Sequence, residues 1–233
     1  DDEWLHSFYY FNDEIPTDAD FEKSIGDYLT FEFSMVMQNR EMRYKNFITG
    51  KLSQLEHKEI PALDEKKWSQ FRLGDLFEVS RPSARNKDDY KVGDIPFVAS
   101  GAMNNGVMKC CKMKVEEKLD SGNCITVSPV DGSSFYQPMD FLGRGGADSS
   151  ILILRDNGLN LFSGEFMARV IQQTCSKYNY GHMGNKDSIK REHIMLPITD
   201  TGKPDYAYME QYAKNMMLRK YEQYLTFIDS REE

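Results

Sequence analysis

Hydrophobic residues recur at helical spacing in two long stretches, one towards each end of the chain. The first runs from Phe21 to about Lys58, with a break at Gly50, and the second runs from about Asp205 to Ser230. Apolar side chains three and four positions apart lie on one face of an α-helix, so both stretches predict helices with a face to bury. We expect the long C-terminal helix to bury its face against a partner or against the first helix.

Between these helices the pattern changes to short apolar runs separated by turn residues about every ten positions, which is typical of β-strands. The runs that predict strands cover residues 76–79, 95–98, 106–108, 124–128, 134–136, 151–154 and 194–198. One further helix is predicted over residues 163–176, with Ser163 as its N-cap. The pattern therefore favours an α+β fold: a mixed or antiparallel β-sheet domain with an N-terminal helical extension and a long C-terminal helix.

A charged stretch over residues 59–67 separates the first helical part from the strands. We expect residues 1–67 to form the helical extension and linker, and residues 68–204 to form the sheet domain. Residues 205–233 are expected to form a helix for dimerisation or subunit docking. The chain does not begin with Met and it ends in a charged stretch, so we expect either a complete chain or a trimmed piece of a longer one.

The net charge of −8 argues at first against a nucleic-acid partner, because phosphate contacts need Lys and Arg. The acid is concentrated at the N-terminus: residues 1–67 hold 15 acidic and 8 basic residues, whereas residues 68–200 hold 16 of each. The bases of this neutral middle form three clusters: Arg81, Arg85, Lys87 and Lys91; Lys109, Lys112, Lys114 and Lys118; and Lys177, Lys186, Lys190 and Arg191. Each cluster alone is typical of a solvated face, but together they keep a nucleic-acid-binding surface among the alternatives.

The cysteines and histidines show no spacing that predicts a metal site. Cys110, Cys111, Cys124 and Cys175 form no C-x-x-C pair, and the four histidines are scattered. We expect reduced cysteines packed as small apolar groups, no bound metal and no cofactor. The chain has no run of about 18 apolar residues and no signal-peptide pattern, so we expect a cytoplasmic protein without membrane contact.

Five motifs follow one another between residue 68 and about residue 215. They are Trp68-x-x-Phe71-x-Leu73-x-Asp75-Leu76-Phe77; Ile95-Pro96-Phe97-Val98-Ala99-Ser100 with Asn104-Asn105-Gly106-Val107; Gly122-Asn123-Cys124-Ile125-Thr126-Val127 with Phe135-Tyr136; Lys177-Tyr178-Asn179-Tyr180-Gly181 followed by Ile194-Met195-Leu196-Pro197; and Pro204-Asp205-Tyr206-x-Tyr208-Met209-Glu210. In this order the segments resemble target-recognition domains of type I restriction-modification specificity subunits. The last motif is similar to the variant found beside type IIG and IIB methyltransferase-nucleases.

The resemblance implies sequence-specific binding of double-stranded DNA without catalysis, by a specificity subunit or domain that directs a separate adenine methyltransferase and endonuclease. In that family one recognition domain binds one half of a split site, and a specificity subunit usually carries two such domains joined by long helices. This chain has one. Three arrangements therefore remain open: a half-subunit that associates with itself through the C-terminal helix, a piece of a longer protein, or the specificity end of a fused enzyme.

Side chains suited to reading DNA come from the loops of the predicted sheet domain. The candidates are Asn104, Asn105, Lys109, Lys112, Ser133, Ser134, Gln137, Arg144, Lys177, Tyr178, Tyr180, His182 and Lys186. The amides of Asn104 and Asn105 suit adenine, the Arg144 guanidinium suits guanine, and the serines and Gln137 bond either type of base edge. The lysines suit phosphates, while the aromatic groups bond phosphate or stack on bases. Each residue also has a structural interpretation, since Asn104-Asn105-Gly106 is first a tight turn and the tyrosines suit a core.

Two other function classes fit parts of the sequence. A protein-interaction module that keeps this fold without reading DNA is favoured by the net charge of −8. A nuclease is indicated by Glu116-Glu117-Lys118 with Asp94 upstream, which imitates the two carboxylates and lysine of Mg²⁺-dependent nucleases. The same triplet arises readily by chance in a chain with 28% charged residues.

Other catalytic interpretations lack their essential residues. A phosphate cradle at Gly143-Arg144-Gly145-Gly146 is disfavoured because such loops open a helix, whereas a predicted strand follows here. The sequence also contains no G-x-S-x-G, H-E-x-x-H or Asn-Pro-Pro-Tyr type of motif. The sequence therefore predicts a binding domain rather than a methyltransferase or hydrolase.

Overall fold

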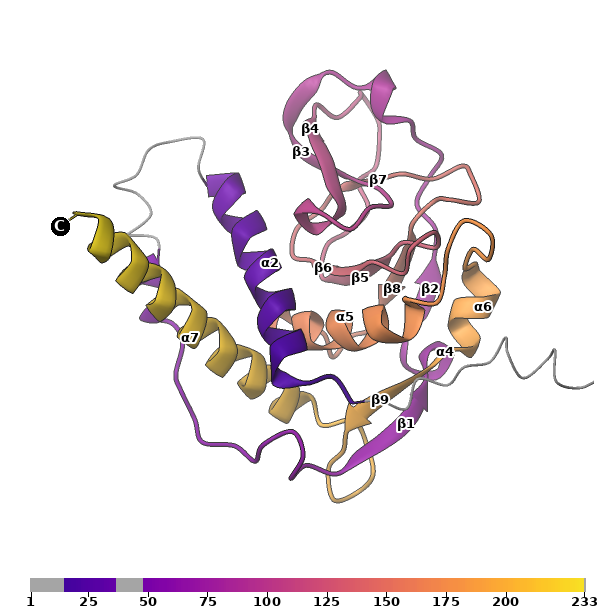
Figure 1. Ribbon diagram of the computed structural model, residues 1–233. Coiled ribbons are helices and arrows are strands. Elements are labelled where there is room, and N and C mark those ends of the chain that lie inside the picture. The colour runs from indigo at the N-terminus through magenta and orange to yellow at the C-terminus, as the bar shows by residue number, and fades with distance from the viewer. Residues whose placement is uncertain (1–14, 37–47, 233) are drawn as a thin grey trace, which may run out of the picture.

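The structure is a computed structural model that describes residues 15–36 and 48–232 (Figure 1). Helix α5 (Leu161–Cys175) lies against one face of a four-stranded sheet, and a smaller three-stranded sheet lies on the opposite side of that sheet from α5. Helices α2 (Asp18–Val36) and α7 (Tyr206–Glu232) pack beside α5. The expected α+β class is confirmed, with its N-terminal helix and long C-terminal helix. Among the described residues, no helix is both long and apolar enough to cross a membrane.

The four-stranded sheet is antiparallel and has the order β2-β8-β5-β6. Its strands are β2 (Glu78–Ser80), β8 (Leu152–Arg155), β5 (Cys124–Val127) and β6 (Ser134–Gln137). Every residue of β5 is buried, because α5 covers one face of the sheet while residues such as Val98 and Phe141 cover the other. A strand that is buried on both faces reads as a continuous apolar run, and this explains why the sequence predicted it well.

The smaller sheet has the order β4-β3-β7 and its own core. Its strands are β4 (Val107–Cys111), β3 (Val92–Val98) and β7 (Leu142–Gly143), with β3 antiparallel to β4 and parallel to β7. Two 3-10 turns flank it, η2 (Lys87–Asp89) and η3 (Asn104–Gly106). The core of this sheet consists of Tyr90, Phe97, Ala99, Cys111 and Leu142. The free, buried state expected for the cysteines holds for Cys111, Cys124 and Cys175, whereas Cys110 is half-buried.

Strand β1 (Trp68–Arg72) and the helices α4 (Leu73–Leu76) and α6 (Lys186–Arg191) were not predicted from the sequence. Strand β1 pairs antiparallel with β9 (His193–Pro197), which agrees with the strand predicted over residues 194–198, and α4 packs on α6. Strand β1 is half-buried without clean alternation, and α6 contributes one buried residue, Ile189. Elements this short carry too few apolar positions for a periodic signal.

Helices α2, α5 and α7 share one hydrophobic core. The ring of Phe166 lies 4.4 Å from that of Phe21 in α2, 5.6 Å from Tyr212 in α7 and 6.2 Å from Trp68 in β1. The apolar face of α7 is therefore covered by the first helix and by α5. Up to Thr226, the described part of α7 leaves no large apolar side chain exposed. The division of the chain at residues 67 and 204 remains a prediction.

Two predicted helix boundaries are wrong. Asn160, not Ser163, caps α5: its side chain accepts hydrogen bonds from the backbone of Phe162 and Ser163, and the Ser163 side chain accepts from the Asn160 backbone. In this capping box Ser163 is the third helical residue, so the helix starts earlier than the apolar pattern suggested. Gly50 lies inside a helical turn over residues 48–52 rather than at a break, and residues 55–61 hold no helix. Residues 37–47 of the predicted first helix lie outside the described part.

Glu165 of α5 is a carboxyl buried in the core. It is 3% exposed, and its Oε1 atom has no hydrogen-bond partner. Burial, and then the charge of Glu32, raise the pKa of Glu165 well above the usual 4.5. The unfolded chain loses this proton above about pH 4.5 while the folded chain keeps it, so Glu165 makes folding less stable as the pH rises above that value.

We expect Glu165→Met to raise the free energy of unfolding at pH 7 by about 1–3 kcal/mol, the cost of an unsatisfied buried polar group. The gain should shrink as the pH falls below about 4.5, where the unfolded wild type becomes protonated as well. Urea unfolding of both proteins across this pH range is the measurement. A Met variant that is less stable than the wild type at pH 7 would contradict this account of Glu165.

Candidate nucleic-acid interface

The turn that carries Asn104 lies beside the segment that carries Arg144. The backbone N–H of Arg144 donates to the Val98 carbonyl at 2.8 Å, and that of Ala99 donates to Gly106 at 2.9 Å. Asn104 has a φ of 51°, a left-handed conformation that Asn tolerates better than most residues. Asn104 is exposed and Arg144 is half-buried. The structure thus brings the candidate adenine-reading amide and the candidate guanine-reading guanidinium onto neighbouring segments.

Asn105 and Gln137 do not lie on this surface. Asn105 is 4% exposed and donates from Nδ2 to the Tyr136 carbonyl at 2.9 Å, while Gln137 is 3% exposed and donates from Nε2 to the Asn105 carbonyl at 3.0 Å. Their amides join η3 to β6 inside the protein. We therefore remove both residues from the DNA-contacting set, because their hydrogen-bonding groups are already used in the fold.

Ser133, Ser134 and Tyr178 are buried as well. The Ser134 hydroxyl donates to the Gly132 carbonyl at 2.9 Å, and the Tyr178 hydroxyl donates to Glu192 Oε1 at 2.5 Å. Burial, and then the bond to Glu192, raise the pKa of Tyr178. These three residues are also removed from the set. Their roles are to shape the β5–β6 turn and to anchor the connection between α5 and α6.

That α5–α6 connection presents several candidates on one loop, which rises at the right of Figure 1. Tyr180 is 83% exposed and His182 is exposed too, as is Lys186, the first residue of α6 after the loop. Lys177 is half-buried and its Nζ lies 2.6 Å from Glu192 Oε2, so it already has an ion-pair partner. The backbone N–H of Gly184 donates to the Pro129 carbonyl at 2.8 Å, which fixes the loop against the β5–β6 turn.

Two candidate lysines in and after β4 differ in exposure. Lys109 of β4 is half-buried and donates from Nζ to the Tyr90 carbonyl at 3.1 Å, whereas Lys112, directly after the strand, is exposed. Eight candidates remain on or near the surface: Asn104, Lys109, Lys112, Arg144, Lys177, Tyr180, His182 and Lys186. Whether they touch DNA stays a prediction.

Acidic residues of the N-terminal segment are paired with bases on the helical side of the molecule. Lys220 lies 2.8 Å from Glu22, Arg169 lies 2.7 Å from Asp20, and Lys51 lies 2.6 Å from Glu32. The Tyr212 hydroxyl also donates to Asp18 at 2.5 Å. These carboxylates therefore act within the bundle of α2, α5 and α7. The net charge of −8 for the whole chain is therefore not a measure of the charge on the loops of the four-stranded and three-stranded sheets.

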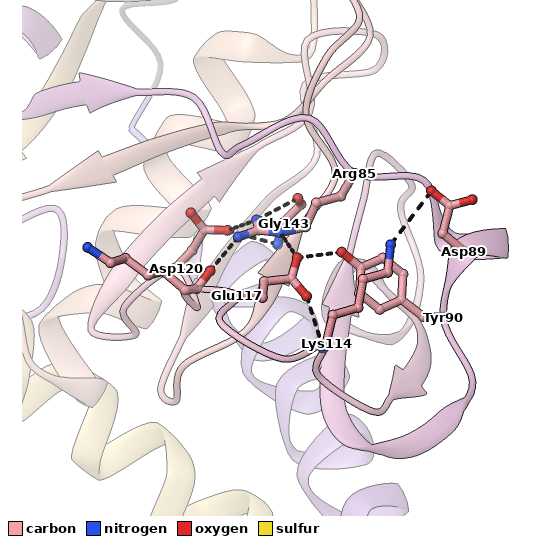
Figure 2. Close-up of polar contacts among 8 residues, drawn as sticks. Arg85, Asp89, Tyr90, Lys114, Glu117, Asp120 and Gly143 are labelled. Carbon is pink, nitrogen blue, oxygen red and sulfur yellow. Dashed lines mark hydrogen bonds and ion pairs between the residues drawn. The ribbon is translucent and has the colours of Figure 1, made fainter.

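Arg85 was counted from the sequence as part of a basic surface cluster, and this is wrong. It is 8% exposed and forms ion pairs with Glu117 at 2.9 Å and with Asp120 at 2.5 Å (Figure 2). The Glu117 carboxylate of the suspected nuclease triplet is thus held by Arg85. Among the residues described, no group of three or more His, Cys, Asp and Glu side chains is arranged to hold a metal ion.

A family model described as the type I restriction modification DNA specificity domain matches residues 65–224. The chain belongs to this family. The specificity domain begins just before β1 and ends within α7, so it includes every strand described above, α5, α6 and every remaining candidate residue. The family resemblance stated from the sequence motifs is confirmed.

Two relatives come from Heyndrickxia coagulans. The specificity subunit S.BcgI of a type II restriction enzyme is 31% identical over 193 residues, which cover 82% of this chain and 54% of that subunit. The type II restriction enzyme and methyltransferase RM.BcgI is 59% identical over 39 residues, which cover 17% of this chain and 6% of that protein. The present chain therefore spans about half the length of S.BcgI.

Among solved structures, the chain resembles the S subunit of a type I restriction-modification system from M. genitalium. The TM-score is 0.49 at 10% sequence identity, and the match covers 91% of this chain and 55% of that one. The S subunit from Thermoanaerobacter tengcongensis gives a TM-score of 0.46 at 12% identity, covering 92% of this chain and 52% of that one.

Proposed function

We propose that this chain reads one half of a split double-stranded DNA site and directs a separate adenine methyltransferase and endonuclease to it. The observation that carries the proposal is the match of the specificity-domain family to residues 65–224. The name of its relative S.BcgI, a specificity subunit, supports the same role. Sequence reading falls to the domain, and modification and cleavage fall to its partners.

The remaining candidates suit this division of labour. The exposed amide of Asn104 offers a paired donor and acceptor, and the half-buried Arg144 offers a fork of donors, groups of the kind that distinguish base pairs in the major groove. Lys112 and Lys186 are exposed cations of the kind that hold phosphates and set register. Tyr180, which is 83% exposed, offers a hydroxyl and a ring at the tip of the α5–α6 connection.

The proposed partners are DNA and a methyltransferase-nuclease. The short match to RM.BcgI, an enzyme with both activities in its name, supports a partner of that kind. Self-association through α7 remains part of the proposal. Because the apolar face of α7 is covered up to Thr226, that contact would use the polar side of the helix or residues after Thr226. We also propose a cytoplasmic location, where such systems meet DNA.

The chain is proposed to have no catalytic activity of its own. Glu117 is bound by Arg85 and Tyr90, which leaves Glu116 and Asp94 as the other carboxylates of the suspected nuclease site. Purified chain should leave duplex DNA uncut in the presence of Mg²⁺. Cutting that depends on Mg²⁺ and is lost in Glu116→Ala would establish the nuclease and contradict this part of the proposal.

Lys112→Ala is expected to weaken binding to every duplex and to reduce the slope of log affinity against log salt by about 0.9, the value for one phosphate contact. Fluorescence anisotropy with a labelled duplex, measured from low to moderate salt, gives both numbers. Lys203→Ala is the matched control, since Lys203 is an exposed lysine in the turn between β9 and α7. Equal slopes for the wild type and Lys112→Ala would remove Lys112 from the interface.

The same titration separates DNA reading from the protein-interaction alternative. A module that binds only protein predicts no binding to duplex DNA at low salt. The proposed function predicts binding that falls as salt rises, because counterions are released from the phosphates on binding.

A further inference from the structure

The segment between β4 and Asp120 ends in a tight turn over Lys114–Glu117. The backbone N–H of Glu117 donates to the Lys114 carbonyl at 3.3 Å, and Glu116 has a φ of 63°. A positive φ at the third position is what a type II turn requires. Val115, the other central residue, is 94% exposed. The turn therefore presents an apolar side chain to solvent on a defined backbone.

A buried arginine anchors this turn to the protein, as Figure 2 shows. Arg85 donates from Nε to Glu117 Oε1 at 2.9 Å and from Nη2 to the Lys118 carbonyl at 2.5 Å. Its Nη1 donates to Asp120 Oδ2 at 2.5 Å and to the Gly143 carbonyl at 3.1 Å. One guanidinium thus holds four groups from two separate segments.

Glu117 completes the anchor from the side of the turn. Its carboxylate also accepts a hydrogen bond from the Tyr90 hydroxyl at 2.5 Å and from the backbone N–H of Lys114 at 3.3 Å. Burial alone would raise the pKa of Glu117, but the hydrogen bonds from Tyr90 and Arg85 outweigh it and lower the pKa. Glu117 is therefore charged, and both ends of the turn are tied to it.

The same network reaches β7, the strand that ends directly before Arg144. Asp120 accepts the backbone N–H of Gly143 at 3.0 Å, while Arg85 binds the Gly143 carbonyl. A β-bridge between Asp120 and Phe141 continues this contact. Arg144 follows directly in the chain. The position of the Lys114–Glu117 turn is thus fixed relative to the candidate base-reading arginine.

Stability is a poor explanation for such a network. Taking a guanidinium and two carboxylates out of water has a large desolvation cost, and well-packed apolar residues often stabilise a protein as much or more. What the network provides is geometry, because a guanidinium has a fixed fork of donors. A buried ionic cluster that fixes an irregular loop suggests that the function of the loop depends on its position.

The outward side of the loop suits a DNA backbone. Over residues 112–118 the exposed charged groups are Lys112, Lys114, Lys118 and Glu116, three cations against one carboxylate. Lys114 lies 4.3 Å over the Tyr90 ring and 3.9 Å from Asp89, which leaves Lys112 and Lys118 as the cations best placed for phosphates. Val115 between them is an apolar group of the kind that contacts thymine methyls or base steps.

We propose that the Lys112–Lys118 segment is a second DNA-contacting element and that Arg85 is the positioning residue that sets it relative to Arg144. The inference rests on the proposed function and adds to it a specific contact surface. Lys112 and Lys118 bind phosphates, Val115 contacts the groove between them, and Arg85 acts through the backbone without touching DNA.

The surface part is tested with Lys118→Ala and Val115→Ser, against Lys203→Ala as control. Both are exposed positions, so the variants should fold. Lys118→Ala should reduce the salt slope by about 0.9. Val115→Ser should weaken binding severalfold with an unchanged slope, because it removes no charge. If both variants bind every duplex as Lys203→Ala does at all salt concentrations, the segment is not an interface.

The positioning part is tested with Arg85→Lys, which keeps the charge and loses the fork. Circular dichroism shows whether this variant folds. The folded variant should show a severalfold loss of discrimination between the preferred duplex and a single-base-pair variant of it. A merely structural role would leave that ratio unchanged. In the double variant with Arg144→Ala the two losses should not add, because Arg85 acts through Arg144.

Failure of this inference differs from failure of the proposed function. If the wild type selects a sequence but Lys118→Ala, Val115→Ser and Arg85→Lys leave affinity, slope and discrimination unchanged, only the inference is overturned. If the wild type binds no duplex, the proposed function and the inference are both overturned. An Arg85→Lys variant that does not fold leaves the two surface variants to decide.

Discussion

Arg144→Ala is expected to relax the preference of this chain at one base pair, with a loss of about 1–3 kcal/mol in discrimination against the wrong base. This corresponds to roughly fivefold to 150-fold in the affinity ratio. A guanidinium presents two parallel donors to O6 and N7 of guanine, and no other base pair offers both acceptors in the same place. Affinity for duplexes that already lack the preferred base should change little. Competition binding with duplexes that differ at single positions measures the effect.

The backbone at Arg144 is held in place by contacts that such a specific contact with a base would need. Its N–H binds the Val98 carbonyl, and the preceding residue, Gly143, is fixed by Asp120 and Arg85. Arg144→Lys is the matched control, since it keeps the charge and loses the bidentate fork. It should lose discrimination nearly as Arg144→Ala does while retaining more affinity. An equal loss on every sequence would instead assign Arg144 to phosphate.

Phe21→Ala is expected to lower the free energy of unfolding of the whole chain by about 3–5 kcal/mol, as for other buried aromatic residues. Phe21 is 1% exposed and its ring lies 4.4 Å from Phe166 and 5.1 Å from Tyr212. The cavity would open where α2, α5 and α7 meet. Because the core of α5 continues into the four-stranded sheet, the sheet should lose stability together with the helices. Urea unfolding followed by fluorescence measures the loss.

Lys23→Ala, an exposed position on the same helix, is the control and should change the free energy of unfolding by less than about 0.5 kcal/mol. Two separate transitions in Phe21→Ala, with the second unchanged from wild type, would show that α2 is an independent unit. That result would support the predicted division at residue 67. A single shifted transition would favour one cooperative domain that includes α2.

The sheet strands were predictable from the sequence because their burial leaves a direct trace in it. The run Cys124-Ile125-Thr126-Val127 is apolar because both faces of β5 are covered, and turn residues bound it on each side. The cap of α5 was missed because the sequence offers two suitable residues. Asn160 and Ser163 both suit an N-cap, and only the capping box shows which residue begins the helix.

The division of polar residues between core and surface was not predictable. Asn104 and Asn105 are adjacent and chemically identical, yet one is exposed and the other bonds the Tyr136 carbonyl inside the protein. Arg85 likewise looks like its neighbours in a basic cluster. Its burial depends on Glu117 and Asp120, about thirty residues away, and pairing over such a separation is set by the tertiary fold rather than by local pattern.

Selection of bound duplexes from a randomised pool, followed by sequencing, tests most directly whether this chain reads DNA. The chain should enrich one short sequence over the starting pool, and Arg144→Ala should lose the preference at one position of that sequence while Lys203→Ala retains it. A pool that remains random after repeated rounds, even with a methyltransferase partner added, would contradict the account.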